Sequence, residues 1–327
     1  MDVVAVQDGA AGPCPPDRVA EVLAGGDGFV WVDVPELDED AARFLSETFG
    51  FHPLALKACA ERTHVPRLHA YGDHVFVVLH GAERGAEGHV HLLQVNVFVS
   101  ERYLVTVHGP LGEGVAVETA LVETGAVRRR LDGGRLRPRS AGELGHTVIT
   151  AIARRLEGLV SELATEVASL ERRVRGDVGR DTERVLEELF LLRHELLTLR
   201  TMAAQGREVL ARMAGMSREL PGLDRPFLED LVDQYARLRA LCDEEKEFLQ
   251  GVVDFYQAKT TTKMNIAMER LALIAALILP ITAVASIYGM NLIVSDETRP
   301  IHLAGVLVVI GLVTLAMLRW TRKHGWW

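Results

Sequence analysis

Apolar and polar residues follow two different patterns along this chain. In residues 1–140 the apolar residues form short runs rich in β-branched and aromatic side chains, such as residues 29–34 and 74–79, which are typical of β-strands. Two further runs joined by residues 100–102 predict a hairpin. Residues 38–50 predict a capped helix that ends at a glycine. The first 140 residues are therefore expected to form an α+β domain.

From residue 141 onward the apolar residues recur at alternating spacings of three and four, which indicates helices that bury one stripe. The first stripe contains Leu156, Leu159, Leu163, Val167, Leu170 and Val174, and the second contains Val185, Leu189, Leu192, Leu196 and Leu199. These stripes predict an antiparallel helical hairpin over residues 141–222. A third helical run, within residues 223–288, meets no proline between Phe227 and Pro280. A helix of that length spans roughly 80 Å, so part of it is expected to stand clear of a bilayer as a stalk.

The two most apolar stretches of the chain lie at its C-terminal end. Residues 271–288 and 301–318 are each long enough to cross roughly 30 Å of hydrocarbon. A pair of buried core helices is the alternative, but the second stretch has no polar face. The short connection between them, residues 289–300, requires both of its ends to lie on the same side of the membrane. The basic residues at the end of the second span, assigned to residues 301–319, predict that the tail of residues 320–327 is cytoplasmic.

This topology places the N-terminal domain and both termini in the cytoplasm and the short connecting loop outside. One face of the first span becomes more polar towards its outer end, and it contains Met268, Leu271, Ala275, Leu279, Thr282 and Ser286. A packing seam between helices is the alternative interpretation, since small residues favour such contacts. Two spans per chain cannot enclose an aqueous path. If this face lines a pore, several copies must surround one axis.

Composition excludes several other classes of protein. The formal net charge is −9, which argues against a nucleic-acid partner. The three cysteines are scattered, so they form neither a disulfide framework nor a thiolate metal site. No cleavable signal peptide is apparent at the N-terminus. The motifs of phosphate-binding loops, serine hydrolases and zinc proteases are absent, so no enzymatic activity is expected.

The tetrapeptide Tyr288–Gly289–Met290–Asn291 closes the first span, after a large acidic polar region. In that position it resembles the signature of the CorA family of magnesium transporters, and residues 49–56, 74–79 and 277–291 resemble the same family. The resemblance implies a homopentamer in the inner or plasma membrane, with the stalks and first spans forming a central funnel. It implies that hydrated Mg²⁺, with Co²⁺ or Ni²⁺ as alternatives, enters the cytoplasm down the membrane potential. No cofactor is implied beyond the transported ion.

The resemblance also assigns roles to individual residues. Gly289, Met290 and Asn291 would form the selectivity filter, where a ring of neutral amide oxygens can hold a hydrated ion without removing its water. The acidic residues Asp296 and Glu297 of the external loop would raise the local concentration of cations. The remaining pore-lining residues are Thr282, Leu279, Leu271, Met268, Asn265 and Asp254.

Family resemblance further implies that Mg²⁺ bound between soluble domains closes the channel. It points to Asp230, with Asp233 nearby, as regulatory metal ligands. The opposing segment departs from the family pattern, because Lys57 and Ala58 stand where two acids are usual. Paired carboxylates make such an interface depend on metal, since unshielded like charges repel. We therefore expect closure to be weaker or to use other acids, such as Glu61.

Two other functions remain open at this stage. A zinc transporter of the same superfamily is one, although Met290 favours magnesium because zinc-transporting relatives often carry isoleucine there. A histidine-rich segment could supply zinc ligands, and it contains His64, His69, His74, His80, His89 and His91. The other alternative is a membrane-anchored sensor or assembly protein that conducts nothing.

Overall fold

The computed structural model describes residues 1–7, 9–25, 28–85, 88–176, 182–218, 222–289 and 300–323. The chain divides into two compact units, Met1–Val252 and Val253–Trp327. The first unit contains a mixed sheet and the helices that cover it, and the second contains apolar helical segments.

A seven-stranded sheet in the order β2-β1-β3-β7-β6-β5-β4 forms the centre of the first unit. Its strands are β1 (Asp2–Gln7), β2 (Ala10–Pro13), β3 (Phe29–Val34), β4 (Arg67–Ala70), β5 (Val75–Arg84), β6 (Val90–Val99) and β7 (Tyr103–His108). Neighbouring strands are antiparallel except for β3 and β7, which pair in parallel with Val30 opposite Tyr103. The hairpin predicted around residues 100–102 is confirmed as β6–β7.

One face of the sheet is covered by short helices. They are the 3-10 turn η1 (Pro16–Arg18), α1 (Val19–Ala24), α2 (Glu39–Phe49) and α3 (Pro53–Ala60). The predicted capped helix is confirmed as α2, because the Asp38 side chain accepts a hydrogen bond from Ala41 N at 2.7 Å and Gly50 ends the helix at φ +66°. The aromatic ring of Phe51, beyond α2, stacks on Phe98 of β6 with a centroid distance of 4.0 Å.

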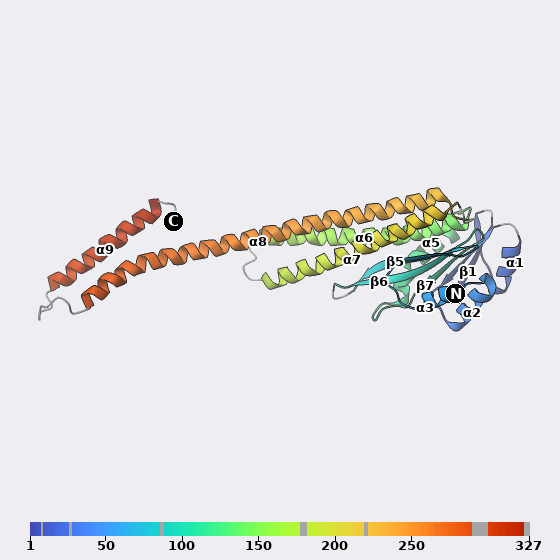
Figure 1. Ribbon diagram of the computed structural model, residues 1–327, viewed down its shortest axis with the longest axis horizontal. Helices are drawn as coiled ribbons and strands as arrows, with labels where there is room; N and C mark the ends of the chain where they lie inside the picture. Colours follow the sequence, from blue (N-terminus) through green and yellow to red (C-terminus); the bar gives the residue numbers. More distant parts are fainter. Residues whose placement is uncertain are drawn as a thin grey trace. The chain divides into compact units, whose positions relative to one another are not determined.

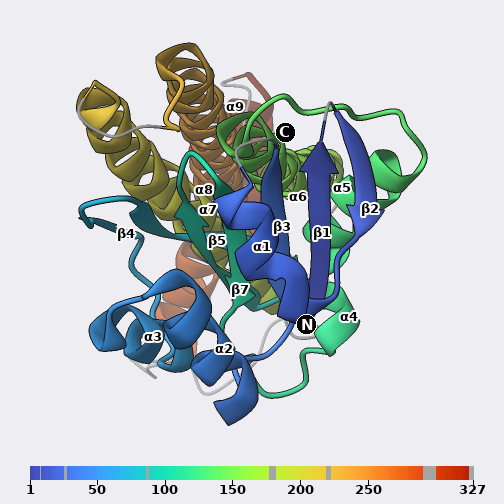
Figure 2. The same ribbon diagram turned by 90° about the vertical axis from the view of Figure 1, so that its right-hand side faces the viewer.

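The opposite face of the sheet carries α5 (Val122–Asp132), α6 (Ala141–Arg175) and α7 (Thr182–Met216) (Figure 2). The short helix α4 (Val117–Ala120) precedes α5 and contacts it. The side chain of Ser140 caps α6 by accepting from Glu143 N at 3.1 Å. Every residue of the two apolar stripes predicted between residues 156 and 199 is buried. The expectation of two helices packed through such stripes is therefore confirmed.

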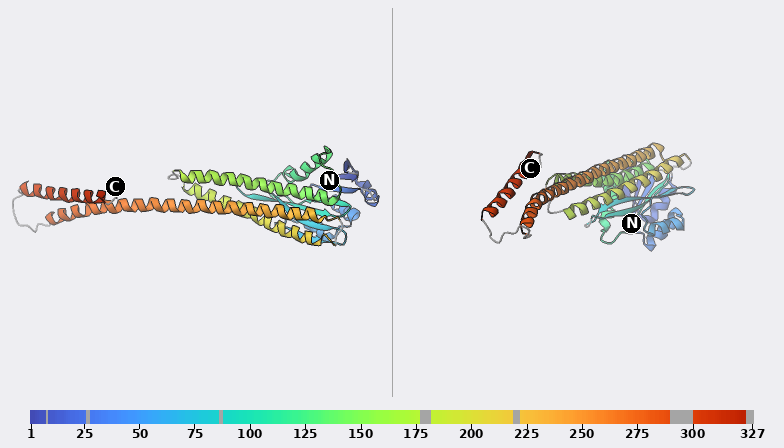
Figure 3. Two further views of the ribbon diagram at one scale, coloured as in Figure 1. Left: turned by 90° about the horizontal axis from the view of Figure 1, so that it is seen from above. Right: turned by 60° about the vertical axis from the view of Figure 1, so that its left-hand side comes forward.

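Helix α8 (Arg225–Gly289) is 65 residues long and continues through Pro280 without ending (Figure 1). Its first part belongs to the first unit and packs on α6 and α7. Gln234 Nε2 donates to Thr150 Oγ1 of α6 at 3.2 Å, and Arg200 of α7 donates to Asp243 of α8. The rest of α8 lies in the second unit with α9 (Pro300–Lys323), which runs back in the opposite direction (Figure 3).

Candidate ion path and regulatory surface

The C-terminal half of α8 presents an uncovered face that changes in polarity along its length. Because the helix is continuous, the six residues predicted to line a pore fall within roughly one third of its circumference. All six are exposed: Asp254, Asn265, Met268, Leu271, Leu279 and Thr282. Large apolar side chains on this face are more than half exposed, with values of 57% for Met268, 66% for Leu271 and 67% for Leu279. The described part of the chain therefore leaves this face uncovered.

The hydroxyl group of Thr282 has a defined orientation. Its Oγ1 donates to the carbonyl oxygen of Ile278, one turn earlier, at 3.0 Å. Since the hydroxyl hydrogen is used within the helix, the lone pairs of the oxygen remain available to accept. Thr282 is thus suited to accept hydrogen bonds from the water shell of a cation.

The basic residues of this part of α8 lie away from the candidate face. Lys263 is two residues from Asn265, and Arg270 is two residues from Met268. A separation of two residues is about 200° around a helix, so both bases project from the opposite side. The face keeps one carboxylate, Asp254, among its described residues, and this favours cations over anions.

Two described helices, α8 and α9, contain windows that are long and apolar enough to cross a membrane, and only 6% of each window is buried. A buried core helix would be covered by its own chain, so that alternative is disfavoured. Gly289 is the last residue of α8. The other residues of the predicted filter and loop, Met290, Asn291, Asp296 and Glu297, lie outside the described residues and stay predictions.

The candidate regulatory acid Asp230 already has partners within its own chain. His146 Nε2 of α6 lies 2.7 Å from its Oδ2, and Gln234 Nε2 donates to the same oxygen at 2.6 Å. The hydrogen bond with His146 is the main cause of the lowered pKa of Asp230. The imidazole ring of His146 is also held beside Phe227, with a centroid distance of 5.1 Å. The neighbouring acid Asp233 is exposed.

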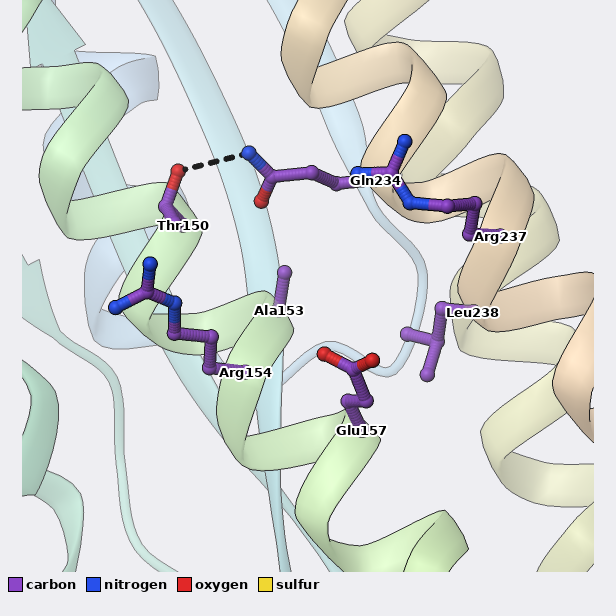
Figure 4. Close-up of a pocket in the computed structure, with 7 residues that line it drawn as sticks. All are labelled: Thr150, Ala153, Arg154, Glu157, Gln234, Arg237 and Leu238. Atoms are coloured by element: carbon purple, nitrogen blue, oxygen red, sulfur yellow. Dashed lines mark hydrogen bonds between the residues drawn. The ribbon is translucent and has the colours of Figure 1, made fainter.

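A groove of about 200 Å³ runs between α6 and α8 just beyond this cluster (Figure 4). The hydrogen bond between Thr150 and Gln234 crosses one end of the groove. Its lining residues are Thr150, Ala153, Arg154, Glu157, Gln234, Arg237 and Leu238. The groove contains charges of both signs, so its lining does not select an ion of one sign.

The segment that departs from the family pattern lies on α3. Lys57 Nζ is 3.6 Å from Glu61 Oε1, and both side chains are about two-thirds exposed. Glu61, the acid expected to substitute for the missing ones, therefore lies beside a base. Among the described residues no group of three or more His, Cys, Asp or Glu side chains could hold a metal ion. A regulatory metal ion at Asp230 would need ligands from another copy.

Two histidines of the predicted zinc-binding segment, His74 and His80, are buried and have partners within the fold. His80 is buried on β5 and its Nε2 donates to Thr63 O at 2.7 Å. Burial lowers the pKa of His80 to about 4. His74 is also buried, with Nδ1 2.7 Å from Asp73 Oδ1. Neither side chain contributes to a metal-binding group.

One buried ionic cluster was missed by the sequence analysis. The side chain of Glu195 on α7 is fully buried and accepts two hydrogen bonds from Arg84 of β5, at 2.8 and 3.0 Å. Arg84 also donates to Glu166 of α6. A carboxylate inside the apolar stripe of α7 is the signal that could have revealed this cluster. It joins the sheet to both helices of the hairpin.

Comparison with known proteins identifies relatives over nearly the whole chain. The family model described as CorA-like Mg2+ transporter protein matches residues 26–323. The chain is 24% identical to the putative metal ion transporter YfjQ of Bacillus subtilis over 303 residues, which cover 90% of this chain and 89% of that protein. It is also 24% identical to the cobalt/magnesium transport protein CorA of Thermotoga maritima over 307 residues, covering 90% and 83%.

A more distant relative carries a different description, and a solved structure shares the fold. The zinc transport protein ZntB of Pectobacterium atrosepticum is 22% identical over 266 residues, covering 80% of this chain and 76% of that protein. The complete structure of the CorA magnesium transporter from Methanocaldococcus jannaschii superimposes with a TM-score of 0.81 at 17% identity, covering 100% of this chain and 99% of that one. The chain therefore shares the fold of that protein over its whole length.

Proposed function

Because the chain belongs to the family of CorA-like Mg2+ transporter proteins, we propose that several copies of it form a channel that carries hydrated Mg²⁺ into the cytoplasm. The observation that carries the proposal is the uncovered face of α8. It has the acid Asp254 and the amide Asn265 at one end, large apolar residues in the middle and the Thr282 hydroxyl at the other end. This order suits a path that attracts a cation, closes by excluding water and supports the ion's water shell.

The assembly follows from the number of spans. One copy contributes two membrane helices, and a closed wall around water requires more. Contacts that bring α8 of more than two copies around one axis are heterologous, and they form a ring when the rotation between copies closes. A homopentamer in the inner or plasma membrane, with both termini in the cytoplasm, is the arrangement we propose by resemblance to the family.

The chemistry of Mg²⁺ fits a path that leaves the water shell of the ion in place. Mg²⁺ releases its water reluctantly, so neutral oxygens that bind the water shell select it without trapping it. We propose that Asn291, with Gly289 allowing close approach and Met290 packing nearby, forms this filter, and that Asp296 and Glu297 attract cations outside it. Thr282 then accepts from the water shell one level deeper.

Beyond Thr282 the ion would meet three apolar rings, formed by Leu279, Leu271 and Met268. Such rings close a pore when water leaves them. Asn265 and Asp254 would receive the ion on the cytoplasmic side. The membrane potential would drive entry, because a divalent ion gains about 4.6 kcal/mol per 100 mV, twice the value for a single charge.

Uptake of Mg²⁺ into liposomes that contain the purified chain tests the proposal. We expect uptake that depends on an inside-negative potential, and near-complete loss of it in Asn291→Ala. Equal uptake by both proteins would refute the filter, and no uptake by either would refute the channel.

Zinc transport is the second candidate, favoured by the similarity to a relative described as a zinc transporter. Competition in the same assay distinguishes the two ions. We expect excess Co²⁺ or Ni²⁺ to reduce Mg²⁺ uptake. Zn²⁺ flux that exceeds Mg²⁺ flux at equal concentration would reverse the assignment.

A further inference from the structure

We propose that the outer surface of α3 in one copy docks directly onto an exposed face of α8 in the next copy, with no metal ion between them. The inference rests on the proposed assembly of several copies. It concerns what holds their soluble units together.

The exposed face of α8 is apolar at a regular interval. Leu241 and Phe248 are separated by seven residues, so they lie on one side of the helix, as in a seam between packed helices. They are 37% and 43% exposed. Asp233 and Glu244 flank this line and are also exposed. The exposed base Arg237 lies on the same side, one turn before Leu241. The face therefore offers apolar contact area with two carboxylates and one base beside it.

Other sides of α8 hold it to its own copy. The buried residues of its first part include Tyr235, Cys242 and Leu249, which lie on a different side from Phe248. Arg237 and Leu238 of α8 also line the groove beside α6 (Figure 4). Within one copy no described helix covers Phe248. A second copy is the occupant that a homo-oligomer supplies.

The outer surface of α3 has complementary properties. Leu54 and Lys57 lie one turn apart and are exposed, with 67% of Leu54 accessible. Val65, Arg62 and Arg67 continue this surface into β4, and all three are exposed. Because the pair of Lys57 with Glu61 is exposed, it is weak enough for Lys57 to exchange partners. The α3 surface thus offers apolar residues with bases beside them.

The two surfaces of one copy cannot reach each other. Helix α3 belongs to the layer on one face of the sheet, whereas α8 packs on α6 and α7, which belong to the other face. A contact between the surfaces is therefore a contact between copies, and it is head-to-tail. Repeated around an axis, such a contact closes a ring and leaves no surface unpaired. That is the arrangement a pore of several copies requires.

The charges on the two surfaces favour direct contact. Lys57, Arg62 and Arg67 would approach Asp233 and Glu244, and opposite charges attract without a bridging cation. A divalent cation placed there would be repelled by Lys57. Glu61 on the α3 surface is paired with Lys57, and Asp230 of α8 already accepts from His146 and Gln234. The residues present therefore do not fit a metal bridge.

Maleimide labelling of the full chain in lipid nanodiscs tests the proposal. Gly251 lies between Phe248 and Phe255, and a Cβ there meets no atom within 4 Å, so Gly251→Cys is a mild reporter. The native cysteines are buried and should label slowly. Gly158→Cys on α6, where the space around the Cβ is equally open, is the matched control. We expect Gly251→Cys to label about tenfold more slowly than the control, in EDTA and in excess Mg²⁺ alike.

Charge reversal identifies the partners. Lys57→Glu should remove the protection of Gly251→Cys in EDTA, and Asp233→Lys or Glu244→Lys in the same chain should restore it. Protection that requires Mg²⁺ would overturn the direct contact. Fast labelling in a protein whose native mass is oligomeric would also overturn it, and would leave the channel proposal standing. A monomeric mass in lipid would instead remove the proposed function.

Discussion

The ring of Tyr235 on α8 lies directly against the backbone of Gly206 on α7. A Cβ at position 206 would stand 2.5 Å from Cε1 of the ring and 2.7 Å from Cδ1. The tyrosine is only 1% exposed, so its ring has no free space to enter. The missing side chain at residue 206 therefore allows the two helices to approach closely, and this contact fixes the first part of α8 on the hairpin.

Substitution of this glycine should destabilise the first unit. Gly206→Ala forces the ring or the helices apart, and overpacking of this kind costs about 1–3 kcal/mol. Gly158→Ala on α6 is the control, since its Cβ meets nothing within 4 Å and alanine should stabilise that helix by about 0.5–1 kcal/mol. Thermal unfolding of the two purified variants compares them. Shifts of the same sign would contradict the close contact.

Sequence periodicity predicted the helices well because each apolar stripe depends only on residues a few positions apart. The buried stripe from Leu156 to Val174 and the ends of α2 at Asp38 and Gly50 were found in this way. The strand order was not predicted. The parallel pairing of β3 with β7 joins Val30 to Tyr103, and no local pattern connects residues so far apart in sequence.

The same distinction between local and long-range information applies to the candidate site. The shared face of Met268, Leu271 and Leu279 could be predicted because a single continuous helix places them on one side, and its role as a pore lining remains a proposal. The buried Glu195 was missed because its partner Arg84 is 111 residues away. A carboxylate in an apolar stripe has meaning only once that arginine is placed beside it.

Acid should weaken the fold through His80. Burial lowers the pKa of this histidine from 6.5 to about 4. Between these pH values the imidazole is protonated in the unfolded chain and neutral in the folded chain. The contribution of His80 to the free energy of unfolding is fully present above pH 6.5 and is lost as the pH falls towards 4. We expect a loss of about 2 kcal/mol between pH 7.5 and pH 5. Unfolding of wild type and His80→Gln at both values measures it, and an unchanged pH dependence in the variant would exclude His80 as the cause.

The oxygen of Thr282 should matter more than its shape. Its hydroxyl hydrogen is held by Ile278 O, so the function we propose for it is acceptance from the ion's water. Thr282→Val keeps the shape and removes the acceptor, and we expect Mg²⁺ uptake to fall about tenfold. Thr282→Ser keeps the acceptor and should stay near the wild-type rate. Similar rates for the valine and serine variants would show that the hydroxyl has no part in conduction.

The carboxylate of Asp254 should act through its charge. Asp254→Asn removes an acid from the candidate face, and we expect Mg²⁺ uptake to fall several-fold at low ionic strength. Salt shortens the reach of a charge to about 8 Å at 0.15 M, so the difference from wild type should shrink there. Glu162→Gln, which removes an exposed charge from a different helix, α6, is the control. A loss that is independent of salt would indicate a structural role for Asp254.

The apolar middle of the face should act as the closed gate, and Leu279 is the residue that tests it. Leu279→Ser places a hydroxyl where we expect the pore to exclude water, and a constriction that stays wet cannot close by dewetting. Leu277→Ser is the matched control, because two residues turn the helix by about 200° and direct its side chain away from the face. Both variants place the same polar group in the same span, so any general cost to membrane insertion is shared. We therefore expect resting Mg²⁺ uptake to rise in Leu279→Ser alone, as followed with a fluorescent indicator inside liposomes. If Leu277→Ser leaks as much as Leu279→Ser, the face assigned to the pore is the wrong side of α8.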